Sequence, residues 1–187
     1  MSLCGSAGAL PAYVDILHAM PEDTGMVFII LTHRRLGRPS WLLQILSRAT
    51  RMRVEEIVDG TIFERNRVYI VPAGTDLTMD GSAFKLMPTA KMVGWPDAFD
   101  IFLRSLAQCT HNRAVTVILS GMASDGSAAL GELRKSGGIN FAQTGAAYPS
   151  MPDSAFDTGN IDSVGSSLEL GKMLSGLDAI YIPAIAI

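Results

Sequence analysis

Short apolar runs alternate along this chain with amphipathic stretches, and this alternation constrains the fold more than any other feature. Residues 26–31 form the run Met-Val-Phe-Ile-Ile-Leu, and residues 114–119 form the run Ala-Val-Thr-Val-Ile-Leu. Runs of this length, rich in branched side chains, are typical of parallel strands buried on both faces. Residues 10–20 have apolar side chains at helical spacing, with Pro11 in the first turn. Strands alternating with helices predict an α/β fold: a doubly wound, mainly parallel sheet in a three-layer α/β/α sandwich.

The other expected elements fit this alternation, with one exception in the middle of the chain. There, Asp80-Gly81 separates two short extended runs, which predicts an antiparallel β-hairpin from Leu77 to Met87. Further strands are expected at residues 54–58, 67–71, 139–142 and 161–164, and further helices at residues 39–49, 97–109, 127–135, 154–157 and 168–177. The tail at residues 180–187 has no partner that the sequence identifies.

Composition narrows the classes of protein. A length of 187 residues suits a single domain spanning 1–187, and 48% hydrophobic residues are enough for a sizeable core. The net charge is −3 and no long block of Lys or Arg occurs, which argues against nucleic acid as a partner. The local cluster of Arg48, Arg51 and Arg53 is interpreted as a solvated helix end.

The two cysteines and the first twenty residues give further expectations. Cys4 and Cys109 lie far apart without CxxC spacing, so neither a disulfide framework nor a zinc site is expected. The start lacks a basic region, and no apolar run is long enough to span a membrane. We therefore expect a cytoplasmic protein. Met1-Ser2-Leu3 is compatible with a cloning-derived start.

Three loops carry residues suited to chemistry, and each also has a structural interpretation. Ser6 lies in the small-residue turn Cys4-Gly5-Ser6-Ala7-Gly8, where a helix start could hold an oxyanion. The same turn is compatible with a helix cap or a phosphate-binding loop, although it matches neither GxGxxG nor the lysine-bearing P-loop.

His33 and Asp125 occupy the two other loops. His33 leaves the end of the buried run at residues 26–31, whereas His18 and His111 have ordinary surface placements. A strand-terminal histidine bonded to backbone is the structural alternative. Asp125 lies in the loop at residues 120–126 and could orient an imidazole, but its spacing favours an N-cap for the helix that follows. One side chain could serve both roles.

Taken together, the three loops predict a catalytic triad of Ser6, His33 and Asp125. Each follows a strand of one parallel sheet, so all three belong to the same sheet edge. A triad needs this convergence, because histidine accepts the serine proton while the carboxylate orients the histidine. The order Ser, His, Asp differs from the usual α/β-hydrolase order of Ser, Asp, His, and GxSxG is absent because Cys4 replaces the first glycine. The chain is therefore not a standard α/β-hydrolase.

At these three loops the sequence resembles the catalytic domain of CheB-type methylesterases. That family carries a GAS[TA]GG turn, a QH after the second strand and a [TS]GxGxDG loop late in the domain. The corresponding stretches here are residues 5–9, Thr32-His33 and residues 120–126. Further matches occur in order at residues 68–72, 102–107, 141–143 and 151–152, so the resemblance covers nearly the whole chain. Residues 21–25 and 46–48 are closest to the version fused to a receptor methyltransferase.

The resemblance implies a function for each motif. Ser6 is the implied nucleophile, His33 the general base and then acid, and Asp125 the orienting carboxylate, with the backbone N–H groups of Ala7 and Met122 as oxyanion donors. The implied reaction hydrolyses glutamate methyl esters on the cytoplasmic helices of chemotaxis receptors, through an acyl-enzyme and with no metal or cofactor. Glutamine deamidation is the implied side activity. A methyltransferase or receiver domain is expected elsewhere, because these residues contain none.

The chain also departs from the family pattern. Ala9 replaces the second glycine of the turn, Cys4-Gly5 replaces Gly-Ala, and the stretch around Trp95 diverges. The first strand is reduced to a remnant. These departures keep a second hypothesis open, that of a catalytically weak or inactive signalling or binding module that retains the fold.

The residues after His33 give a prediction about substrate access. Arg34 and Arg35 follow directly, where the family commonly has an apolar residue and proline, and we expect them at the rim of the site. Exposed arginines there would guide an acidic or amidated protein surface towards the serine. No long insertion offers a lid, so we expect an open, shallow cleft.

Overall fold

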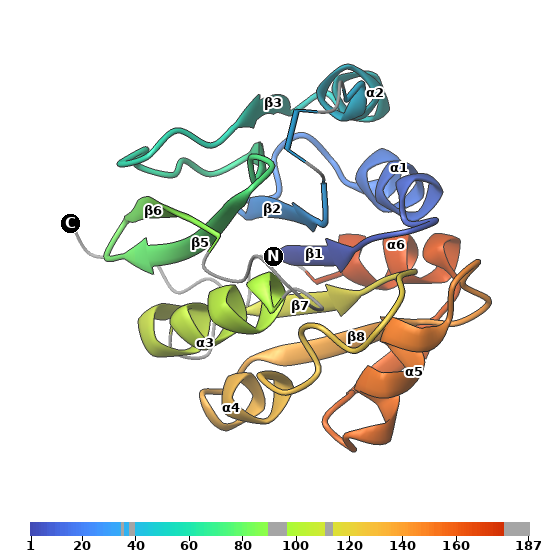
Figure 1. The fold of residues 1–187 in the computed structure, drawn as a ribbon. Helices are drawn as coiled ribbons and strands as arrows, with labels where there is room; N and C mark the ends of the chain where they lie inside the picture. The colour runs from blue at the N-terminus through green and yellow to red at the C-terminus, as the bar shows by residue number, and fades with distance from the viewer. Residues whose placement is uncertain (35, 38–39, 90–96, 111–113, 178–187) are drawn as a thin grey trace.

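The computed structural model of the chain describes residues 1–34, 36–37, 40–89, 97–110 and 114–177. Seven parallel strands form one sheet in the order β3-β4-β2-β1-β7-β8-β9. The predicted α/β class and mainly parallel sheet are confirmed (Figure 1). The strands of this sheet are β1 (Ser2–Gly5), β2 (Val27–Thr32), β3 (Arg53–Glu56), β4 (Arg67–Ile70), β7 (Val115–Ile118), β8 (Ile139–Gln143) and β9 (Ser163–Gly165).

The predicted hairpin is also present and forms a separate two-stranded sheet. Strand β5 (Thr75–Asp80) pairs with β6 (Ala83–Pro88) in antiparallel register, with Asp80 opposite Ala83. Gly81 in the turn has a φ of 58°, a conformation that glycine adopts without strain.

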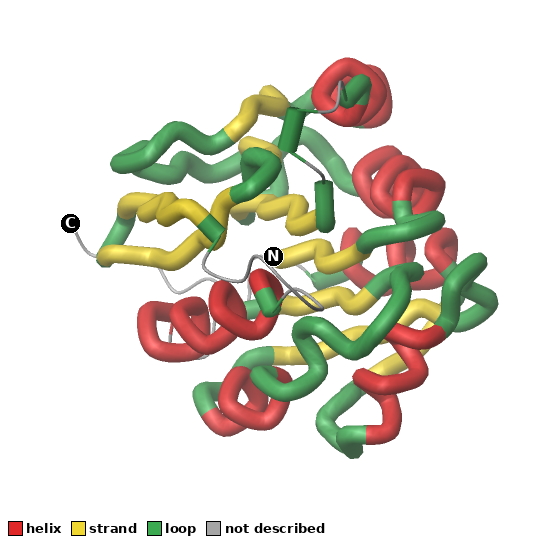
Figure 2. Tube along the Cα trace, in the orientation of Figure 1, coloured by secondary structure: helices red, strands yellow, loops and turns green. Residues whose placement is uncertain are grey.

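Six helices cover the two faces of the sheet among the described residues, and Figure 2 shows helices on both sides of the strands. One core packs α1 (Leu10–Ala19), α2 (Leu42–Ala49) and α6 (Ser167–Ser175) against one face. The other core packs the hairpin with α3 (Ala98–Thr110), α4 (Leu130–Lys135) and α5 (Ser150–Asp157) against the opposite face. The predicted three-layer sandwich is therefore confirmed.

Strand β1 lies at the centre of the sheet although it has only four residues. Leu3 and Cys4 are both fully buried, and they point into opposite cores. Strands β2 and β7 pair with β1 on its two sides, so every residue of the strand is buried. The remnant expected from the sequence is thus a complete central strand, and a cloning-derived start stays a prediction.

Three helices begin three or more residues from their predicted starts. Helix α2 begins at Leu42 rather than residue 39. Helix α4 begins at Leu130 rather than residue 127, because a turn precedes it. Helix α5 begins at Ser150 rather than residue 154, with Pro149 as its N-cap residue and Pro152 in its first turn. Proline is tolerated there because the first N–H groups of a helix need no intrahelical partner.

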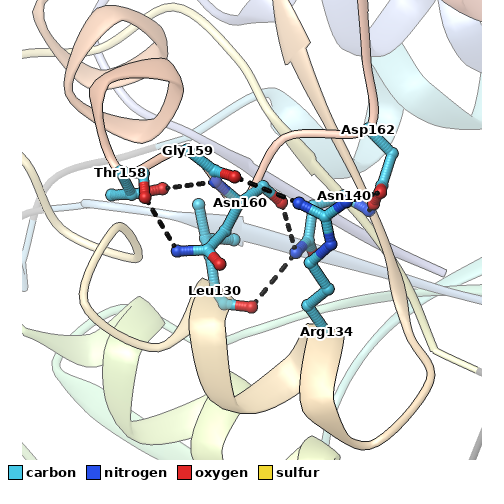
Figure 3. A network of polar contacts seen from close by, with 7 residues as sticks. All are labelled: Leu130, Arg134, Asn140, Thr158, Gly159, Asn160 and Asp162. Carbon is cyan, nitrogen blue, oxygen red and sulfur yellow. Dashed lines mark hydrogen bonds and ion pairs between the residues drawn. The ribbon is translucent and has the colours of Figure 1, made fainter.

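A polar network centred on the buried side chain of Asn140 holds the far end of the sheet together (Figure 3). The side-chain amide of Asn140, in β8, donates to the carbonyl oxygens of Leu130 and Asn160 at 3.1 and 3.0 Å. Its backbone N–H donates to Asp162 at 2.9 Å, and Arg134 bonds the same carboxylate and the carbonyl of Gly159. The network thereby ties α4 and β8 to the chain that leads into β9.

Candidate active site

The predicted triad loops meet where the strand order reverses. From β1 the chain passes to β2, then to the edge strand β3 and back to β4 between them, and it crosses to β7 on the other side of β1. In open α/β sheets, binding sites form in the crevice at this point, beyond the carboxyl ends of the strands. Ser6 follows β1, His33 follows β2, and the loop containing Asp125 follows β7.

Strand register places Ser6 next to His33. Gly5 and Thr32 are the last paired residues of β1 and β2, and Ser6 and His33 are the next residue of each chain segment. Neighbouring strands lie about 4.8 Å apart, so the two residues enter the crevice side by side. Ser6 Oγ has no hydrogen-bond partner among the described residues; catalytic serine–histidine contacts are often loose before substrate binds.

His33 and Asp125 form a close pair. His33 Nε2 lies 2.8 Å from Asp125 Oδ2. The side chain of Asp125 is only 1% exposed and that of His33 is 19% exposed, so the pair is shielded while the imidazole still reaches the crevice. Because Nε2 faces the carboxylate, Nδ1 is the nitrogen left for the serine, the reverse of the more familiar assignment.

Asp125 also caps a helix, but not the one that the sequence indicates. Its two carboxylate oxygens accept the backbone N–H groups of Phe99 and Asp100, each at 3.1 Å, in the first turn of α3. A negative charge at a helix N-terminus is favourable, and the bonds satisfy donors that the helix leaves free. The helix that follows Asp125 is α4, whose N-terminal Ala129 N–H is instead bonded by Asp100 Oδ1 at 2.8 Å. The predicted cap of the following helix is therefore wrong, since Asp125 caps α3, and its role in orienting His33 stays a prediction.

Ser120 joins three segments around Ser6. Its carbonyl accepts the N–H of Ser6 at 2.8 Å, which continues the contact between β1 and β7 two residues beyond their last paired residues. Its hydroxyl donates to the carbonyl of Ala7 at 2.8 Å and accepts the N–H of Tyr148 at 3.0 Å. Its own N–H donates to the side-chain amide of Gln143 at 2.9 Å. Ser120 is fully buried, so these bonds fix the turn at Ser6.

The backbone donors expected for an oxyanion are free among the described residues. The N–H groups of Ala7 and Met122 make no hydrogen bond to another described residue, whereas the neighbouring N–H of Gly121 is bonded to Tyr148. Ala123, which stands at the second glycine of the family's loop pattern, has a φ of 68°. Left-handed backbone at a non-glycine residue is strained and is found mainly at functional sites.

Two departures from the family pattern compensate each other in space. A methyl group at Gly5 would lie 2.5 Å from Cβ of Ala9, closer than two carbon atoms approach. The family has alanine where this chain has Gly5, and glycine where it has Ala9. One methyl group therefore fills the space between positions 5 and 9 both in the family and in this chain, and the turn at Ser6 keeps its packing.

Arg34 is held within the protein. Its guanidinium donates to Glu56 at 2.7 Å and to the carbonyl of Val71 at 2.7 Å, and its side chain is 16% exposed. These contacts tie the loop after His33 to β3 and to the end of β4. The substrate-rim role of Arg34 stays a prediction. Arg35, Trp95 and His111, on which other predictions fall, lie outside the described residues.

Sequence reasoning did not assign Phe99, Asp100 or Ser120 to the site. Asp100 lies in the first turn of α3, where an acidic residue signals a helix start, but spacing gives no hint that it bonds α4. Burial and the nearby charge of Asp125 raise the pKa of Asp100. Burial, with the charges of Asp125 and Asp100, also raises the pKa of Cys4, so this thiol stays protonated and unreactive.

An apolar cavity of about 480 Å³ lies elsewhere. Met26, Val27, Val115 and Ile139 line it, at or beside the amino ends of β2, β7 and β8. It is thus at the opposite end of the strands from Ser6, His33 and Asp125. Among the described residues, no group of His, Cys, Asp and Glu is arranged to hold a metal ion. No helix in the described part of the chain combines the length and hydrophobicity needed to cross a membrane.

Comparison with known proteins decides the family. The family model for CheB methylesterase matches residues 1–174. The chain belongs to the CheB methylesterase family. The fold agrees with the crystal structure of the Thermotoga maritima CheB methylesterase catalytic domain, with a TM-score of 0.87 at 23% sequence identity, over 94% of this chain and 96% of that chain.

Curated relatives are longer proteins. The chain is 31% identical over 154 residues to a protein-glutamate methylesterase/protein-glutamine glutaminase of Myxococcus xanthus, covering 81% of this chain and 43% of that protein. It is 35% identical over 137 residues to an uncharacterized 104.1 kDa protein of Rhodobacter capsulatus, covering 72% of this chain and 14% of that protein. The chain spans about half the length of most curated relatives it matches. A fusion to a methyltransferase stays a prediction.

Proposed function

We propose that this chain is a serine hydrolase that removes methyl groups from glutamate side chains of chemotaxis receptors. The observation that carries the proposal is the 2.8 Å pair of His33 and Asp125 at the sheet edge where Ser6 emerges. Family membership supports the substrate class, since relatives are named protein-glutamate methylesterases.

In the proposed reaction, Ser6 Oγ attacks the ester carbonyl carbon while His33 accepts the serine proton. Asp125 keeps the imidazole in place and stabilises the imidazolium that forms. The oxyanion of the tetrahedral intermediate is held by the N–H groups of Ala7 and Met122, which make no hydrogen bond to another described residue. The intermediate then breaks its bond to the methoxy oxygen. His33 returns the proton to that oxygen, and methanol leaves an acyl-enzyme on Ser6.

Water completes the cycle by the same path. His33 removes a proton from a water molecule, whose oxygen attacks the acyl carbon, and the bond to Ser6 breaks as His33 returns that proton to Oγ. The products are a glutamate carboxylic acid, which ionises, and the free enzyme. With a glutamine side chain the leaving group is ammonia in place of methanol, which gives the proposed deamidase activity. None of these steps needs a metal or cofactor.

The proposed substrate is presented by a large partner. Methylated glutamates on the cytoplasmic helices of receptors place the reaction in the cytoplasm, and a methyltransferase or receiver domain is expected elsewhere. The open, shallow cleft and the rim role of Arg34 and Arg35 belong to this proposal. Because Arg34 bonds Glu56 and Val71, its replacement by alanine also tests whether it supports the loop of His33. Equal losses on a receptor and on a small ester would assign it that supporting role.

A fluorophosphonate probe tests the proposal, because it labels an activated serine. We expect the wild-type chain to be labelled and Ser6→Ala to remain unlabelled. His33→Ala should lose labelling as well, whereas His18→Ala, which changes an exposed histidine on α1, should keep it.

Release of methanol from a methylated receptor then tests the substrate. No labelling of the wild-type chain would favour the alternative function, a signalling or binding module that retains the fold. Labelling without methanol release would keep the serine hydrolase and reject the receptor substrate.

A further inference from the structure

The ring of Phe99 lies flat against the imidazole of His33. The ring centroids are 4.2 Å apart and the planes differ by 11°. Phe99 is in the first turn of α3 and is 1% exposed. Its backbone N–H donates to Asp125 Oδ2, the same oxygen that bonds His33 Nε2. A single residue therefore contacts two members of the proposed triad, one through its side chain and one through its backbone.

A flat neighbour restricts the imidazole in a way that one hydrogen bond does not. Rotation of a histidine ring about its last side-chain bond has broad, shallow minima. The bond to Asp125 fixes one nitrogen but allows the ring plane to rock about that contact. Phe99 covers one face of the ring, so the plane that directs Nδ1 towards the Ser6 side is held.

The stacked ring also interacts with charge. The face of an aromatic ring carries partial negative charge and attracts a cation within about 6 Å of its centroid, a condition that the 4.2 Å separation meets. His33 becomes a cation only after it takes the serine proton. An interaction that appears only at that stage raises kcat and leaves substrate binding unchanged.

We propose that Phe99 is a positioning residue of the hydrolytic reaction, which holds the His33 ring plane and stabilises its imidazolium. The inference rests on the proposed function, since it acts through His33. It predicts a role that Phe102, three residues further along α3, does not have. Phe102 is fully buried in the same core and makes no ring contact with His33 among the described residues.

The test compares Phe99→Leu with Phe102→Leu. Both substitutions remove the same atoms from one helix and one core, and leucine keeps an apolar surface in each place. Hydrolysis of a small methyl ester is measured, and the rate is divided by the concentration of folded protein measured by circular dichroism, which removes differences in folded fraction. We expect kcat of Phe99→Leu to fall roughly tenfold with KM unchanged. Phe102→Leu should keep kcat within about twofold of wild type.

The outcomes separate this inference from the function it rests on. Equal kcat values for the two leucine variants, or a rise in KM alone for Phe99→Leu, would overturn the role of Phe99. Ser6→Ala and His33→Ala are assayed beside them. If these two variants still turn over the ester, the proposed triad itself fails. If they are inactive and only the Phe99 prediction fails, the triad stands without its stacked partner.

Discussion

Exchanging the residues at positions 5 and 9 tests how the nucleophile turn is packed. In Gly5→Ala, the new methyl group would lie 2.5 Å from Cβ of Ala9, 2.8 Å from Oη of Tyr13 and 3.2 Å from Cβ of Leu119. None of these atoms moves easily, since two are Cβ atoms and the Tyr13 hydroxyl is bonded to the carbonyl of Leu31. Overpacking of this kind costs about 1–3 kcal/mol, and we expect a value near the upper end.

The reverse change alone is also destabilising, for a different reason. Ala9→Gly removes a fully buried methyl group, about 0.8 kcal/mol, and adds glycine freedom of about 0.5–1 kcal/mol to the unfolded chain. The two losses would sum to roughly 4 kcal/mol if they were independent. In the double variant, however, the 2.5 Å contact disappears and only the contacts with Tyr13 and Leu119 remain. We therefore expect the double variant to be about 1.5–2 kcal/mol more stable than the sum.

Urea unfolding followed by circular dichroism measures the four free energies of this cycle. A control cycle pairs Gly5→Ala with Ala12→Gly, which removes a buried methyl group from the same helix away from Gly5. The control pair should be additive within about 0.5 kcal/mol. If the free-energy changes of Gly5→Ala and Ala9→Gly also add within about 0.5 kcal/mol, the two departures do not compensate each other.

Three further predictions concern the loops of the site. Asp125→Asn should lower the free energy of unfolding by about 2–4 kcal/mol, because the NH₂ group of an amide would point at one of the helix N–H donors that the carboxylate now accepts. The control Ser6→Ala should change the free energy of unfolding by less than about 1 kcal/mol. Equal urea midpoints for the two variants would contradict the capping role. Burial and the charge of Asp125 raise the pKa of Asp100, so the folded state holds that proton more tightly than the unfolded state. Wild-type stability should then decline as the pH rises from the ordinary carboxyl pKa through the raised one, and Asp100→Asn, compared by melting temperature at several pH values, should lack this decline. Ala123→Gly should raise the free energy of unfolding by about 0.5–1 kcal/mol, because glycine adopts the left-handed backbone at this position without strain. The control Ala19→Gly, in α1, should lower the free energy of unfolding by about 1 kcal/mol. If urea unfolding shows that both variants are less stable than wild type, Ala123 is not strained.

The parts of the fold that follow from local pattern were predictable. Apolar runs locate β2 and β7, and Asp80-Gly81 locates the hairpin, because strand and turn preferences act over a few residues. The shared edge of Ser6, His33 and Asp125 also follows, since parallel strands direct their carboxyl ends the same way. Sequence reasoning therefore selected the pair that the structure places 2.8 Å apart.

The remaining features depend on partners distant in the chain. The capping of α3 by Asp125 and of α4 by Asp100 joins residues more than twenty positions apart, and spacing rules describe only neighbours. Arg34 was expected at an exposed rim because nothing near it in sequence reveals Glu56. The stacking of Phe99 on His33 likewise requires the position of α3 relative to β2.

The pairing of Gly5 with Thr32 has a consequence for how this molecule tolerates change. Ser6 and His33 lie at matching positions beyond the two strands only while β1 and β2 keep this alignment. A slip of one residue would shift the serine by about 3.3 Å along the strand and would turn Leu3 and Cys4 to the wrong cores. The pairing of β1 with β2 thus sets the position of Ser6 relative to His33. Insertions or deletions within these few residues should abolish activity and folding together, whereas changes of length in the β5–β6 turn leave the pairing of β1 with β2 unchanged.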